Sequence, residues 1–387
     1  MGVIQRMIRF QSWLTWQHHN LSEAAENYER ELRQHPEESD QYPDLIRLER
    51  SLGRPSEERK YLLAYAKAAP DNAQAVLFAG NQLLAANYAD DAVEVYRAGV
   101  KAFPDNKTIE VELGSALLRV GKEDEALPIV KNALDGSSDA NVLNSGAYAL
   151  VSHGPGESLP LAERSALKAV ELLEAELSET TLESVNAGAF RRTNLLLATW
   201  DTLGWVYFAE GKYALAEEYV RAAWRNAAHG EEGLHMGEIL EKKGDDIGAM
   251  RVFELALSRT GGNIATPVVT ELHSRVDALK KKGMTVQDAH PDRSLQDLRT
   301  YHVPRPTGAK GSGVFVVQVS AAKTEKMAMM SGDEIMRGLT DRLMQLDLGL
   351  AVPKESHALL LRTGVLFCST EPTCEFVLTP PESANVN

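Results

Sequence analysis

The chain has 387 residues, a formal net charge of −14, 44% hydrophobic and 25% charged residues, a composition typical of globular proteins rather than disordered ones. The sequence contains no run of 18 apolar residues, so no membrane span is predicted. Near the N-terminus, a signal peptide would need an apolar stretch, but Gln11, Gln17 and His18 are polar. The negative net charge disfavours nucleic acid as a partner. The sequence contains no phosphate-loop, HExxH or nucleophile-elbow motif, so we predict no catalytic residue, no cofactor and no metal site.

Three prolines divide the N-terminal part into units of equal length. Pro36, Pro70 and Pro104 stand 34 residues apart, and each closes a segment with helical character. Gly80 recurs as Gly114 at the same interval, where a small residue lets two helices approach closely. A pair of helices of this size cannot bury its own apolar face, so neighbouring pairs are expected to stack into a solenoid.

The most complete copy of the repeat lies further along the chain. The segment W-D-T-L-G-W-V-Y places Trp200, Leu203, Gly204 and Tyr207 in the spacing W-x2-L-G-x2-Y. This pattern closely resembles the tetratricopeptide repeat consensus. The resemblance implies a right-handed α-solenoid of helix pairs that binds proteins or peptides. Within residues 5–283, the repeats are expected near 5–38, 39–72, 73–106, 107–140, 141–177, 197–229 and 230–262.

One interruption breaks the register between residues 138 and 197. Ala166 and Trp200 are 34 residues apart, about 20 more than equivalent positions in an uninterrupted array. The additional segment is polar and is expected to lengthen the second helix of a pair and then loop out. Two interpretations stay open: an insertion on the binding face, or a tolerated surface loop.

After Gly283 the periodicity changes from 3.6 toward 2, which indicates strands. Two strands, one amphipathic helix and two further strands predict a small ββαββ domain of the α+β class over residues 292–380. The expected elements are the strands 313–320 and 325–331, a helix bearing Ile335, Leu339, Leu343 and Leu346, and the strands 358–369 and 374–380.

Two resemblances concern this C-terminal part. Its Gly-led first strand, its S-G-D-E helix entry and its closing strands look like the C-terminal domain of TonB-type proteins. The whole chain is also similar to the C-terminal part of bacterial secreted proteins with transglutaminase-like domains, through R-T-N-L-L-L-A-T-W-D-T-L-G-W, G-L-H-M-G and G-V-L-F-C-S. In that family the catalytic Cys-His-Asp lies upstream, so the resemblance implies no activity here. The start at Met1 fits a chain that lacks its front half, in which case a periplasmic or secreted location is expected, and otherwise a cytoplasmic one.

The two cysteines, Cys368 and Cys374, flank an expected hairpin. Paired strand ends can supply the Cα separation that a disulfide needs. A bridge would indicate an oxidising compartment, whereas free buried thiols would not, and the sequence leaves both open.

The first helix of each pair is expected to line the concave side of the solenoid and to bind a partner peptide or protein there. Trp205 and Phe208 are the strongest candidates, because aromatic side chains dominate binding hot spots, although large aromatic side chains are also common in cores. Leu77 precedes Asn81 where chaperone-binding relatives carry a carboxylate-clamp lysine, so that clamp is broken and the groove suits an apolar segment. The candidate groove residues are Asn81, Leu84, Ser115, Arg119, Asp201, Trp205, Phe208 and Glu238.

These features together predict a non-catalytic interaction scaffold that binds a protein partner. Two alternatives are the non-catalytic portion of a secreted transglutaminase-like enzyme and a chaperone-like adaptor.

Overall fold

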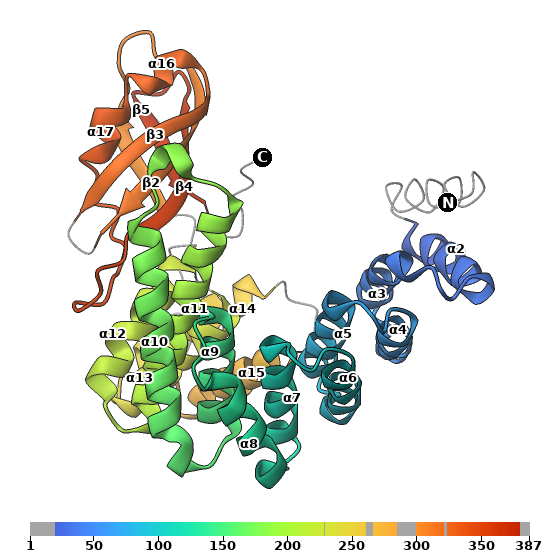
Figure 1. The fold of residues 1–387 in the computed structure, drawn as a ribbon. Coiled ribbons are helices and arrows are strands. Elements are labelled where there is room, and N and C mark those ends of the chain that lie inside the picture. The colour runs from blue at the N-terminus through green and yellow to red at the C-terminus, as the bar shows by residue number, and fades with distance from the viewer. Residues whose placement is uncertain (1–19, 228, 261–265, 285–298, 321–322, 380–387) are drawn as a thin grey trace. The chain divides into compact units, whose positions relative to one another are not determined.

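The structure is a computed structural model that describes residues 20–227, 229–260, 266–284, 299–320 and 323–379 (Figure 1). It divides into two compact units, Met1–Asp135 and Gly136–Asn387, which are described separately below. Three predicted boundaries lie outside the described residues. They are the start of the first repeat at residue 5 and the two ends of the C-terminal domain at residues 292 and 380. The predicted division at residues 283–292 stays a prediction.

The first unit consists of consecutive helix pairs. Pro70 and Pro104 each follow the end of a helix, and the Asn two residues later caps the next helix. The Asn72 side chain accepts hydrogen bonds from the N–H groups of Gln74 and Ala75, and Asn106 caps the following pair in the same way. The described helices are α2 (Leu21–Gln34), α3 (Tyr42–Ser51), α4 (Pro55–Ala68), α5 (Ala73–Ala85), α6 (Ala89–Ala102), α7 (Lys107–Arg119) and α8 (Glu123–Leu134), with a 3₁₀ turn η1 at Ser39–Gln41.

The repeating glycine explains how closely the two helices of a pair approach. A Cβ atom at Gly80 would lie 2.3 Å from the ring of Tyr96, and one at Gly114 would lie 2.3 Å from a methyl group of Val130. Both distances are far shorter than van der Waals contact. Only glycine fits this position in the two pairs, which is why the sequence period was visible.

The second unit continues the helix pairs, as the repeat pattern predicts. Its helices are α9 (Ala140–His153), α10 (Leu159–Ser178), α11 (Ala187–Ala209), α12 (Tyr213–Asn226), α13 (Gly230–Lys242), α14 (Asp246–Arg259) and α15 (Pro267–Lys281), with 3₁₀ turns η2 (Gly156–Ser158) and η3 (Leu182–Ser184).

The interruption lengthens two helices instead of one. Helix α10, the second of its pair, has 20 residues, as expected, but the segment expected to loop out instead also lengthens α11, which has 23 residues. Asn186 caps the backbone N–H of Ala189, and Ala189 and Phe190 are buried, which stabilises the added first turns of α11.

The lengthened helices contact the C-terminal sheet. Gln318 donates from its Nε2 to the carbonyl oxygen of Thr180, 3.1 Å away. The backbone N–H of Leu361 donates to the Thr193 hydroxyl at 3.4 Å, and Glu174 accepts from the N–H of His357 at 3.2 Å. The inserted segment therefore carries contacts within the unit.

The sheet is antiparallel and has five strands in the order β1-β5-β4-β2-β3. Its elements are β1 (Thr300–Pro304), β2 (Gly311–Val319), β3 (Thr324–Gly332), α16 (Glu334–Arg337), α17 (Thr340–Met344), β4 (Leu360–Cys368) and β5 (Thr373–Leu378). The four expected strands are present, and β1 is an additional edge strand.

The expected single helix is two short ones. Gly338 caps α16, and α17 begins at Thr340, because glycine has a poor helix propensity. Met336 and Leu343 still project from the two helices into one core with Phe315 and Phe376. The apolar spacing predicted the buried face in part: Leu339 and Leu343 are buried and Leu346 packs partly against the core, but Ile335 is 49% exposed and Met336 is buried in its place.

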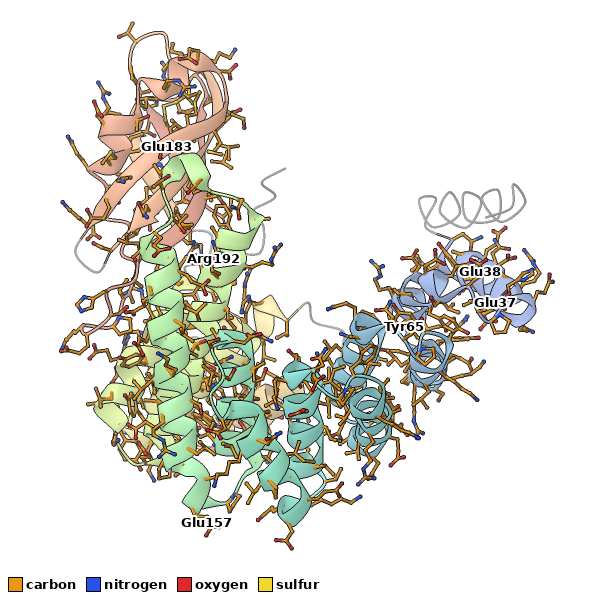
Figure 2. All side chains as sticks on the ribbon, viewed as in Figure 1. Glu37, Glu38, Tyr65, Glu157, Glu183 and Arg192 are labelled. Atoms are coloured by element: carbon orange, nitrogen blue, oxygen red, sulfur yellow. A yellow bond between two sulfur atoms is a disulfide. The ribbon has the colours of Figure 1, made fainter. Side chains whose placement is uncertain are left out.

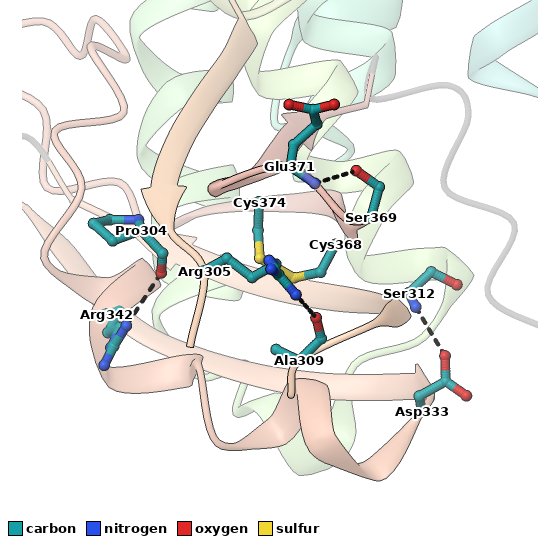
Figure 3. Close-up of a disulfide and its surroundings, with 10 residues drawn as sticks. All are labelled: Pro304, Arg305, Ala309, Ser312, Asp333, Arg342, Cys368, Ser369, Glu371 and Cys374. Atoms are coloured by element: carbon teal, nitrogen blue, oxygen red, sulfur yellow. Dashed lines mark hydrogen bonds between the residues drawn. A yellow bond between two sulfur atoms is a disulfide. The ribbon is translucent and has the colours of Figure 1, made fainter. Parts of the chain in front are cut away.

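A disulfide joins Cys368 at the end of β4 to Cys374 in β5, with Cα atoms 4.4 Å apart (Figure 3). Both cysteines are buried in the sheet core. Arg305, which follows β1, donates to the carbonyl oxygen of Ala309 at 3.2 Å (Figure 3).

Candidate partner-binding face

The four candidate residues of the first unit differ in exposure. Asn81 is exposed and accepts a hydrogen bond from the Tyr96 hydroxyl at 2.6 Å, and Arg119 is exposed at the end of α7. Leu84 and Ser115 are buried. Only Asn81 and Arg119 therefore present side chains that a partner could contact without rearrangement.

The candidates of the second unit come together on α11 and α13. Asp201 pairs with His235, with 2.8 Å between its Oδ2 and the ring Nδ1. Each of the two residues is only 5% exposed. Asp201 lies on α11 and His235 on α13, the first helices of consecutive pairs, which places the two side chains side by side on neighbouring helices.

An aromatic stack covers this pair. The Trp205 ring lies parallel to the His235 ring, with centroids 4.1 Å apart and 13° between the planes. Phe208 stacks on Trp205 at 4.7 Å and 7°. Trp205 and Phe208 are both half-buried, so they are packed against their neighbours and still partly accessible to solvent.

Burial and mutual attraction set the ionisation of the pair. Burial raises the pKa of Asp201 to about 6, although His235 opposes this. Burial alone would lower the pKa of His235, but the Asp201 carboxylate overcomes that effect and raises it to about 9. At neutral pH the pair is therefore ionic, and Trp205 stacks on a protonated ring, an arrangement stabilised by cation–π attraction.

A second charged group lies beside the stack. Arg275 on α15 donates to Glu238 on α13 at 2.5 Å, to Glu241 at 3.2 Å and to Glu271 at 2.8 Å. Burial raises the pKa of Glu238, and Arg275 opposes this shift. The Arg275 guanidinium therefore links α15 to α13 and forms ion pairs with three carboxylates.

Helix α9 joins the same group of side chains. The Tyr148 hydroxyl donates to the Glu231 carboxylate at the start of α13. Glu231 and the neighbouring Glu232 both raise the pKa of Asp201, so they act electrostatically on the buried pair. We call the surface formed by Asp201, Trp205, Phe208, His235, Glu238 and Arg275 the acidic–aromatic face.

Sequence reasoning found four of these six residues and missed His235 and Arg275. A signal for both was present in the repeat period. Asp201 and His235 are 34 residues apart, as are Glu241 and Arg275. Opposite charges one period apart on first helices predict ion pairs between neighbouring repeats.

The group combines a buried ion pair with partly exposed rings. Asp201 and His235 are each 5% exposed. Among the residues that the structure describes, no group of three or more His, Cys, Asp or Glu side chains is arranged to hold a metal ion. The accessible chemistry is that of partly exposed aromatic rings and carboxylates.

The successive helix pairs define a helical-repeat protein, and comparison with known families specifies the repeat. A family model described as tetratricopeptide repeat matches residues 11–73 and 79–141. These two segments of the chain are therefore similar to tetratricopeptide repeats. The matched segments end at residue 141, so the resemblances of the C-terminal part to TonB-type and transglutaminase-like proteins stay predictions.

Several solved structures are similar to this chain, and the first of them shares its fold. A tetratricopeptide repeat protein from Parabacteroides merdae ATCC 43184 is similar with a TM-score of 0.50 and 14% identity, over 71% of this chain and 100% of that one. PilF of Pseudomonas aeruginosa is similar with a TM-score of 0.35 and 18% identity, over 58% and 94% of the two chains. YrrB, described as having an unusual peptide-binding site, has a TM-score of 0.30 and 15% identity, over 59% and 99%.

The comparison with curated proteins finds no match. In the part of the chain that the structure describes, no helix is long and apolar enough to cross a membrane.

Proposed function

We propose that the protein is a non-catalytic scaffold that binds a partner peptide or protein on the acidic–aromatic face, on the side that the repeat pattern predicts to be concave. The observation that carries this proposal is the half-buried stack of Trp205 and Phe208 over a buried ion pair. Asn81 and Arg119 are separate, exposed candidates for partner contact in the first unit. The net charge of −14 favours a protein partner over nucleic acid.

Rigid aromatic side chains are efficient binding anchors. An interface loses about 0.5–1.5 kcal/mol for each flexible side chain that it immobilises. Trp205 is already held by His235 and Phe208, and His235 is held by Asp201. These side chains are therefore already ordered in the free protein, and a partner that binds them loses little free energy by immobilising them.

A photo-crosslinking amino acid at Phe208, introduced in cells that express the protein, tests the proposal. The matched control carries the same amino acid at Leu167 on α10, an apolar side chain that is 41% exposed on a second helix. We expect a discrete crosslinked partner from Phe208 and none from Leu167. The same partner captured only from Leu167, or no partner from Phe208, would contradict the assignment of this face.

One observation bears on the compartment that the alternative of a secreted transglutaminase-like protein requires. The disulfide between Cys368 and Cys374 suits an oxidising compartment, because structural disulfides are rare where thiols are kept reduced. The chaperone-like alternative lacks the corresponding support, since Leu77 stands at the clamp position.

A further inference from the structure

We infer that a cavity at the end of α12 binds a small carboxylate that carries a short apolar chain. The carboxylate pairs with Arg225 and Arg299, and the chain lies against leucine side chains of the cavity wall. This inference concerns a second site and does not depend on partner binding at the acidic–aromatic face.

The cavity is formed by the end of α12, helix α14, the start of β1 and the segment that follows α17. Its volume is about 60 Å³. A single water-sized group needs about 10–15 Å³, so the cavity holds several such groups. The space therefore suits a ligand of a few non-hydrogen atoms.

Two arginines supply the charge of the cavity wall. Arg299 is buried, and its Nη2 donates to the carbonyl oxygens of Asn226 and Ala227 at 3.4 and 3.3 Å, which holds the guanidinium at the end of α12. Arg225 in the last turn of α12 is exposed and forms no hydrogen bond or ion pair with another described residue. Of the described residues that line the cavity, these two are the charged ones. The cavity wall therefore carries positive charge that an anion can pair.

The ionisation of Tyr301, which also lines the cavity, reflects the same positive charge. Burial raises the pKa of the Tyr301 hydroxyl, and three nearby guanidinium groups oppose this shift. These groups belong to Arg362, Arg225 and Arg299, whereas the Asp347 carboxylate raises the pKa. Three cations and one carboxylate thus act on the hydroxyl, which indicates a positive potential at the cavity.

The remaining wall is mostly apolar. Leu255 on α14 lines the cavity, as do Leu348 and Leu350 after α17. The Tyr301 hydroxyl donates to the carbonyl oxygen of Leu348 at 2.5 Å, so its proton is already used and the arginines are the donors for a ligand. A guanidinium pairs a planar carboxylate through two parallel N–H···O bonds, whereas the further oxygens of a phosphate would lie against leucine without a partner. A carboxylate with a short apolar chain satisfies both parts of the wall.

Ligand-observed NMR with butyrate and butyramide on the unmodified protein tests this inference. The two probes have nearly the same shape, but only butyrate is charged. We expect saturable binding of butyrate at about 1 mM and binding of butyramide that is about tenfold weaker, because a charge-assisted hydrogen bond is lost. Equal binding of the two probes, or no saturable binding of butyrate, would overturn the inference. Tighter binding of inorganic phosphate than of butyrate would contradict the role of the leucines.

Two charge variants of α12 locate the site. Arg225→Gln removes the exposed guanidinium at the cavity, and the control Arg221→Gln removes one that lies a turn earlier and pairs with Glu217. We expect Arg225→Gln to weaken butyrate binding about tenfold and Arg221→Gln to leave it unchanged, with helical circular dichroism the same in both variants. Equal effects of the two substitutions would contradict this site, and the comparison of butyrate with butyramide decides the inference even if a variant fails to fold.

Discussion

Substituting Gly237 by Ala tests the packing on which the acidic–aromatic face depends. An added Cβ on α13 would lie 2.0 Å from one carbon of the Phe253 ring and 2.5 Å from two others. Phe253 is fully buried on α14 and cannot move aside cheaply. Overpacking of this kind costs about 1–3 kcal/mol, and the better helix propensity of Ala returns about 1 kcal/mol. Because the clash is with a rigid ring, we expect a net loss of about 1–2 kcal/mol in the free energy of unfolding.

Thermal and urea unfolding, followed by helical circular dichroism, measure this effect. Each kcal/mol should lower the melting temperature by about 2–4 °C for a unit of this size. Gly338→Ala is the matched control, because its Cβ would meet only the carbonyl oxygen of Ile335 at 3.6 Å. We expect the control to change stability by less than about 0.5 kcal/mol. If Gly237→Ala matched the control or were more stable than the wild type, α13 and α14 could not be packed as described.

Three further predictions concern other contacts of the second unit. His235 has a folded-state pKa of about 9, above its unfolded value of about 6.5, so its contribution to stability is full below pH 6.5 and is lost as the pH rises through 9. Urea midpoints at pH 6 and pH 10 should therefore differ less in His235→Gln than in the wild type, and equal differences would contradict an ionic pair. Replacing Cys368 and Cys374 by Ser should cost about 2 kcal/mol through the lost loop closure, and non-reduced native protein should be about 2 Da lighter than reduced protein; equal masses would show that the bridge does not form. Arg362→Met removes donors to the carbonyl oxygen of Asn226, so hydrogen exchange should accelerate at the end of α12 while overall helix content stays constant; unchanged exchange there would argue against this contact.

The repeating part of the fold was predictable because each repeat meets the same local demands. Gly80 and Gly114 lie against large side chains of the following helix, and Asn72 and Asn106 cap the next pair, so the period appears in residue identity. Strand β1 was not predictable in this way. Its pairing partner is β5, where Val303 lies opposite Cys374, and a five-residue segment carries too little pattern to reveal so distant a partner.

The inserted segment shows a different limit of the sequence. Its polar composition indicated a loop or a binding-face insertion. In the structure the carbonyl oxygen of Thr180 accepts from Gln318, which is 138 residues away. No local pattern reveals a contact over that separation.

Four of the six residues of the acidic–aromatic face were predictable from the repeat register. Asp201, Trp205, Phe208 and Glu238 follow from their positions in the consensus, whereas Leu84 and Ser115 turned out to be buried. A helical residue turns by about 100° relative to its neighbour, so a small error in helix rotation moves a side chain from the surface into the core. The role of Asp201 needed the structure, since its pairing with a buried His235 decides that it supports Trp205.

The affinity of the crosslinked partner for two single variants tests the central claim most directly. Isothermal titration calorimetry would compare Phe208→Ala with Leu167→Ala, an apolar truncation on α10. The proposed face predicts that Phe208→Ala weakens binding by about 2 kcal/mol, roughly thirtyfold, and that Leu167→Ala leaves the affinity unchanged. Equal affinities for the two variants, or a loss confined to Leu167→Ala, would contradict partner binding at the acidic–aromatic face.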